Sequence, residues 1–163
     1  MKIRNGFVSN SSSSSFLVAF PRNPKSVEDV KEMVFGKNKV LNNPYVWGDR
    51  PASYPVEEIA EIIWNDVKRQ IPNNRKIILS HLSNVVVDSL DKYKIPVKDG
   101  SSHDYDWDRY EIDNEKEVVK FMEKYTGAFF YCFEYYDNAG ALGSTMEHGD
   151  LFRLLPHLQS SNH

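Results

Sequence analysis

The sequence contains a single cysteine, Cys132, so the chain can form neither an internal disulfide nor a cysteine-rich zinc site. It also lacks any apolar run near the roughly 18 residues that cross a bilayer, and polar residues 9–15 stand where a signal peptide would have its apolar core. Positive charge is not in excess either: the net charge is −3 at pH 7, which argues against a nonspecific coat on nucleic acid. We therefore expect a cytoplasmic protein that binds neither membranes nor nucleic acid.

What is present is the composition of a globular protein, with 163 residues of which 40% are hydrophobic and 26% charged. A chain of this length can bury a core without disulfides or metal, and no internal repeat or long linker divides it. Residues 1–163 are therefore predicted to form one domain. Cys132 stands within the aromatic residues 129–133, which predicts a buried and unreactive thiol.

Helix signals recur along the chain. Residues 26–36 have Ser26 as an N-cap and Gly36 as a stop, and residues 55–70 place apolar side chains at three- and four-residue spacing. Residues 114–127 open with a capping sequence and close at a glycine. Residues 84–93 fit a short helix, through a cap at Asn84, or a strand, through three consecutive valines. We favour the helix.

Strands are predicted at residues 16–20, 76–82 and 128–136, where apolar and aromatic side chains run together. Residues 137–140 read as a turn, after which residues 141–147 can return antiparallel as a further strand. Strands that alternate irregularly with helices are typical of an α+β fold. The predicted architecture is a mainly antiparallel sheet packed with about three helices.

Two irregular stretches also lead to expectations. The serine-rich residues 9–15 fit a flexible linker, and they fit an ordered segment equally well, since apolar residues stand on both sides and the hydroxyls can bond to backbone. We predict that this run packs near the C-terminal hairpin, because the distinctive residues of the chain lie at its two ends. In the loop of residues 37–53, we expect Tyr45, Val46 and Trp47 to pack onto the domain.

Residues 101–115 combine acidic and aromatic side chains. Three aspartates alternate along them and could hold a hard cation, but Arg109 stands where a calcium loop requires glycine, although Glu115 matches its last position. A solvated acidic loop is the simpler interpretation. The functional one is a surface for a basic protein partner, with charges that steer and rings that anchor, formed by Asp104, Tyr105, Asp106, Trp107 and Asp108.

The C-terminal part gathers side chains that bind metals or transfer protons, namely Glu147, His148, Asp150, His157 and His163. A divalent-metal site would need at least three of them to meet at one point. We favour a structural role for these residues, with histidines that bond to backbone, and predict no cofactor. No nucleophile elbow and no His-Glu-x-x-His motif occurs, so the sequence assigns no catalytic residue.

The chain begins MKIRNGFVSNSSSSSF, which resembles an N-terminal signature of small uncharacterised proteins from T4-like bacteriophages and some bacteria. Its last 30 or so residues, with EHGDLF at 147–152, LPH at 155–157 and a final His163, are similar to the C-terminal ends of those proteins. The resemblance implies a phage-encoded accessory protein of the infected bacterial cytoplasm. We expect it to bind and modulate a host or phage protein; the alternative is a small metal-dependent enzyme that uses the C-terminal set.

Overall fold

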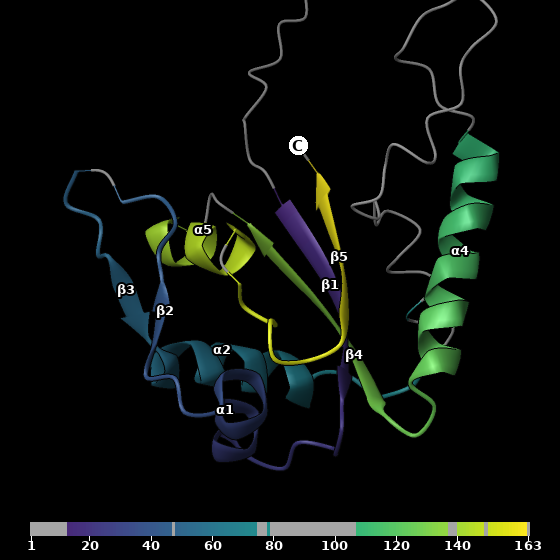
Figure 1. Cartoon of the computed structure of the whole chain (residues 1–163), viewed down its shortest axis with the longest axis horizontal. Helices are drawn as coiled ribbons and strands as arrows, with labels where there is room; N and C mark the ends of the chain where they lie inside the picture. Colours follow the sequence, from purple (N-terminus) through teal and green to yellow (C-terminus); the bar gives the residue numbers. More distant parts are fainter. Residues whose placement is uncertain are drawn as a thin grey trace, which may run out of the picture.

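The computed structural model describes residues 13–46, 48–74, 78, 107–136, 140–148 and 150–162. In chain order its elements are β1 (Ser13–Phe20), α1 (Val27–Phe35), β2 (Val40–Asn42), β3 (Ser53–Pro55), α2 (Val56–Lys68), α4 (Trp107–Lys124), β4 (Phe129–Tyr136), α5 (Gly140–His148) and β5 (His157–Asn162). All strand pairs are antiparallel within these ranges (Figure 1). The predicted α+β fold with a mainly antiparallel sheet is confirmed.

The main sheet has the strand order β4-β1-β5, so the first described strand is the central one. Phe16, Val18 and Phe20 alternate along β1 and pack with the buried side chains of α1 and α2. Leu17 and Ala19 point to the opposite face, where they pack with side chains of α4. Because successive residues of a strand face opposite sides, burial on both faces explains why β1 is apolar at every position from 16 to 20.

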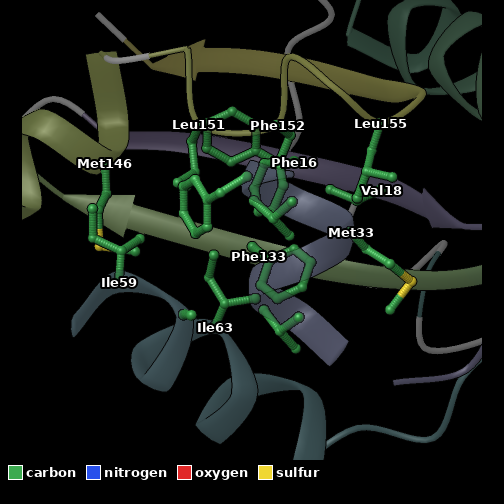
Figure 2. Packing of buried hydrophobic residues seen from close by; sticks show 14 of the residues in the cluster. Phe16, Val18, Met33, Ile59, Ile63, Phe133, Met146, Leu151, Phe152 and Leu155 are labelled. Atoms are coloured by element: carbon green, nitrogen blue, oxygen red, sulfur yellow. The ribbon is translucent and has the colours of Figure 1, made fainter. Parts of the chain in front are cut away.

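The larger core lies between the sheet and the α1–α2 pair. Phe152, from the chain after α5, places its ring centroid 5.2 Å from that of Phe16 and 5.0 Å from that of Phe133 (Figure 2). These rings join β1, β4 and the C-terminal segment in a single cluster, to which Ile59 and Ile63 of α2 contribute the opposite wall. Aromatic pairs at such separations add stability beyond the area that they bury.

Both α1 and α2 form where the local signals place them. The Ser26 side chain accepts a hydrogen bond from the Asp29 backbone N–H, and Gly36 ends α1 with a φ of 58°. A left-handed residue at this position is most easily a glycine. In α2 the buried residues recur every three or four positions, which fixes the face that packs on the sheet.

The serine run enters the sheet. Residues 13–15 belong to β1 and pair on one side with residues 134–136 of β4 and on the other with residues 160–162 of β5. Ser14 is 1% exposed and Ser15 is also buried. The prediction of an ordered serine segment is therefore confirmed for residues 13–15, while residues 9–12 lie outside the described residues.

The strand predicted at residues 141–147 is wrong, because these residues form the helix α5. Every residue from 143 to 147 is buried, so the sequence shows neither the alternation of a half-buried strand nor the 3.6-residue period of a surface helix. The Thr145 hydroxyl donates to the Ala141 carbonyl at 2.8 Å, one turn earlier in the helix. The strand that pairs with β4 is instead β1, whose other edge pairs with β5, a strand made from the polar C-terminal tail.

Two further boundaries differ from the predicted ones. The helix expected from Asn114 begins at Trp107, since no glycine or proline between these positions interrupts it. Ile78 lies in helical backbone and donates its N–H to the Asn74 carbonyl at 2.8 Å, so the strand predicted at residues 76–82 is wrong at this residue. Its other residues, and the helix favoured at residues 84–93, lie outside the described residues.

Candidate functional site

A hollow of about 400 Å³ lies beside β2, between the C-terminal end of α1 and the chain that follows α5. We call it the β2 groove. One wall is formed by residues 38–42, which include all of β2, and the other by residues 150, 151, 153 and 154. Val34 and Phe35 close the α1 end. In Figure 1, β2 lies between β3 and the yellow segment after α5, so one edge of β2 is occupied by β3 and the other faces the groove.

The floor and the rim of the groove differ in exposure. Val34, Leu41 and Leu151 are buried, and they join the floor to the larger core. At the rim, Val40 is 48% exposed and Leu154 is 50% exposed. Large apolar side chains on both walls of one hollow form a surface that binding of another apolar group would cover.

The second wall is held rigidly by the core. Phe152 is packed between the rings of Phe16 and Phe133, and the Leu155 N–H donates to the Phe152 carbonyl at 3.0 Å. This anchoring turns Arg153 and Leu154 outward. Leu154 then rests on the end of α1: a Cβ placed on Gly36 would lie 3.3 Å from Leu154 Cδ1, so the glycine serves this approach as well as the positive φ.

The groove has a positive balance of charge. Among the described residues, its lining includes Lys39 and Arg153, on opposite walls, and a single carboxylate, Asp150. In the part of the chain that the structure describes, neither cation forms an ion pair, whereas the exposed Arg22 and the half-buried Lys31 both do. Glu57, whose pKa is lowered most by its hydrogen bond with Lys31 and also by the charge of Lys39, offsets part of the charge of Lys39. Two cations with no carboxylate at ion-pair distance, beside an apolar floor, still favour an anionic ligand over a cationic one.

The loop after β2 corrects a further expectation. Tyr45 is 39% exposed and Val46 55% exposed, so these residues do not pack onto the domain as predicted. The buried residue is instead Asn43, whose amide donates to the Pro51 carbonyl and whose side-chain oxygen accepts the Tyr45 N–H. Asn43 thus closes the loop from inside and leaves the apolar residues of its tip outside. Trp47 lies outside the described residues.

The candidate metal residues are distributed over three elements. Glu147 is fully buried in α5, and Asp150 is exposed in the groove wall. His157 lies on β5, its ring centroid 6.4 Å from those of Phe16 and Phe152, and its Nδ1 donates to the Leu155 carbonyl at 2.9 Å. The predicted backbone bond is therefore present at His157, and it fixes the proton on Nδ1.

No three acidic, histidine or cysteine side chains within the described ranges lie close enough together to hold a metal ion. Residue 163 lies outside these ranges, and His148 is placed only as the last residue of α5. Of the acidic-aromatic set, Asp104, Tyr105 and Asp106 lie outside the described residues, while Trp107 and Asp108 form the start of α4. A partner surface at 104–108 stays a prediction.

Sequence reasoning missed the groove itself. Among the described lining residues, Asp150 alone was a candidate, because the two walls come from distant parts of the chain and meet through the core. The chain matches no protein-family model, no curated protein and no solved structure. None of the described helices has the length and apolar character needed to cross a membrane.

Proposed function

We propose that this protein is a recognition domain that binds a host or phage protein through the β2 groove. The observation that carries the proposal is the pair of exposed apolar side chains, Val40 and Leu154, that face one another across a hollow with a buried apolar floor. Exposed Tyr45 and Val46 extend the apolar surface beyond β2. A single exposed leucine is ordinary, but a group of them around a groove is typical of protein-binding surfaces.

The side chains in the groove support binding rather than bond-making chemistry. Of the described residues that line it, Asp150 is the one acid, Lys39 is the one amine and stands on the opposite wall, and none is a histidine, cysteine or serine. General acid–base or nucleophilic catalysis needs at least two such groups in mutual reach. The small enzyme that the C-terminal set suggested would thus need another site, whereas a binding function uses the groove as it stands.

The resemblance of the two chain ends to T4-like phage proteins supports the choice of a host or phage protein as the partner. A phage-encoded accessory protein of the infected bacterial cytoplasm meets host and phage proteins there. A groove with apolar and cationic walls suits a partner that presents apolar and acidic side chains.

Leu154→Asp tests the proposal because it places a charge on the apolar rim without altering the core. Ile71→Asp is the matched control, since Ile71 is 69% exposed and does not line the groove. Each variant and the wild type, carrying the same affinity tag, would be used to capture partners from infected and uninfected bacterial lysate. We expect a protein that is retained by the wild type and by Ile71→Asp and lost with Leu154→Asp.

Retention of the same proteins by both variants would overturn the assignment of binding to the groove. Far-ultraviolet circular dichroism of the two variants checks that each remains folded. A photoreactive residue at position 154, compared with one at position 71, gives an independent readout: only the former should form a covalent adduct with the captured protein.

A further inference from the structure

Within the part of the chain that the structure describes, no strand pairs with the outer edge of β2. In the β2–β3 ladder, Asn43 N–H donates to the Ala52 carbonyl and Val56 N–H donates to the Lys39 carbonyl. Since hydrogen-bonded pairs alternate along an antiparallel ladder, Leu41 is the residue between them that bonds to β3. The N–H and C=O groups of Val40 and Asn42 consequently point away from β3, and no described residue bonds to them.

These outward groups lie along the groove. Five consecutive residues, 38–42, line it. Side chains of a strand alternate between its two faces, so consecutive residues can all contact one hollow only if the hollow runs along the strand edge. The groove therefore presents a row of backbone donors and acceptors next to an apolar floor, as sheet edges that take up peptide strands do.

Charge and apolar surface define what would occupy this edge. Lys39 stands on the β2 wall and Arg153 on the opposite one, both exposed and without an ion pair among the described residues. An extended chain laid between the walls would place side chains alternately toward the floor and toward the rim. Apolar side chains at the positions that face the floor would match its apolar surface. Carboxylates at the positions that face the rim would match the two cations.

We infer that the β2 groove takes an extended acidic peptide of a partner protein, which adds to the outer edge of β2 as a third strand, with its backbone bonded to Val40 and Asn42 and its carboxylates beside Lys39 and Arg153. This inference rests on the proposed function and specifies its ligand. Asp150, on the same wall as Arg153, opposes a carboxylate and thereby limits the affinity for acidic peptides.

The probes are a blocked heptapeptide of alternating valine and glutamate with threonine at both ends, a copy with lysine for glutamate, and two further copies of the acidic peptide, one N-methylated at its valines and the other at its glutamates, so that each blocks one edge of the peptide strand. Fluorescence polarisation at low salt measures their affinity for the full-length protein. We expect the acidic peptide to bind roughly tenfold more tightly than the lysine peptide, because the groove cations attract it. N-methylation of the peptide on the edge that pairs with β2 should abolish binding, since it removes the backbone N–H donors of the peptide.

Variants of the protein complete the design. Lys39→Glu and Arg153→Glu should each reverse the preference between the acidic and lysine peptides, and Asp150→Asn should strengthen acidic-peptide binding. Lys124→Glu, on an exposed residue of α4 remote from the groove, is the matched control. It should change neither the preference between the two peptides nor the affinity for the acidic peptide. Equal affinity for the two peptides, or binding that survives methylation of both edges, would overturn the inference.

Failure of this inference can be told from failure of the proposed function. If the peptides show no charge preference but Leu154→Asp still removes the captured protein, the groove binds a partner of different chemistry. If the protein instead sediments as a dimer that Leu154→Asp dissociates, the occupant is a second copy of the chain and the peptide inference is overturned. If neither peptide nor lysate protein depends on Leu154, the proposed function fails with it.

Discussion

The side chain of Gln70 bonds to both backbone groups of Cys132. Its Nε2 donates to the Cys132 carbonyl at 2.6 Å, and its Oε1 accepts the Cys132 N–H at 2.9 Å. Asn73 also bonds to both backbone groups of Phe130. Its side-chain oxygen accepts the Phe130 N–H at 2.8 Å, and its backbone N–H donates to the Phe130 carbonyl at 3.3 Å. Two amide residues after α2 thus close part of the outer edge of β4, which would otherwise present unpaired groups.

Gln70→Ala should destabilise the protein by about 2 kcal/mol, because it leaves an N–H and a C=O of β4 without their partner. Gln159→Ala on β5 is the matched control, since its side chain forms no hydrogen bond with the described residues. Urea unfolding followed by tryptophan fluorescence measures both. A loss for Gln70→Ala no larger than that of the control would contradict the bracing role.

Asp66 and Tyr135 predict a pH dependence of stability. The Tyr135 hydroxyl donates to Asp66 Oδ2 at 3.1 Å; burial raises the pKa of Asp66 above its ordinary 3.8, and this hydrogen bond opposes the rise. A carboxyl whose pKa is higher in the folded state binds its proton more tightly there. Its contribution to stability is therefore greatest below the ordinary value and is lost as pH rises through the folded-state pKa.

Asp66→Asn should remove the fall in the free energy of unfolding that ionisation of Asp66 causes. The variant should therefore gain stability relative to the wild type as pH rises above about 4. Tyr135→Phe should act in the opposite direction, because it removes the bond that favours the ionised carboxylate. Free energies of unfolding measured across the acidic range test both. A difference between Asp66→Asn and the wild type that is independent of pH would show that Asp66 has no raised pKa.

Ser14 is a second buried polar group with a predictable response. Its hydroxyl forms no hydrogen bond with any described residue, although it is almost completely buried in β1. Ser14→Ala should therefore leave the stability unchanged or raise it by up to about 1 kcal/mol. Ser26→Ala should lower it by about 1 kcal/mol, because it removes the N-cap of α1. Equal losses for both variants would contradict this account of Ser14.

Burial raises the pKa of Cys132 to about 12, so its thiol is protonated at neutral and mildly alkaline pH. Because the thiolate is the reactive form, we expect Ellman's reagent at pH 8 to label Cys132 only as fast as the protein unfolds. Labelling that is immediate in the native protein and insensitive to stabilising conditions would contradict the buried placement.

Local patterns were sufficient for α1, α2 and β4. Ser26 and Gly36 mark the ends of α1, and the spacing of the buried residues in α2 gives its inner face, so both can be read from adjacent residues. The strand β5 could not be predicted, because its polar residues form a strand only through pairing with β1, far away in the sequence. The helix α5 was not predicted, because residues buried on all of its sides leave no 3.6-residue alternation of apolar and polar positions.

The β2 groove could not be predicted from local sequence patterns either, because its two walls are far apart in the sequence. Lys39 and Val40 look like ordinary loop residues in the sequence, and Arg153 and Leu154 like part of an apolar segment. Their proximity results from the packing of Phe152 against Phe16 and Phe133, which places the second wall beside β2. Of the C-terminal metal candidates whose side chains the structure describes, Asp150 alone reaches this site, and it does so as part of a wall.

Residue-resolved amide hydrogen exchange, measured by NMR with and without the acidic peptide, tests the central claim most directly. In the free protein the Leu41 amide should be protected by its bond to β3, and the Val40 and Asn42 amides should exchange rapidly. Saturating peptide should slow exchange at Val40 and Asn42 and leave Leu41 little changed. Protection that appears at Gln159 and Ser161 on the β5 edge, with Val40 and Asn42 unaffected, would contradict recognition through the β2 groove.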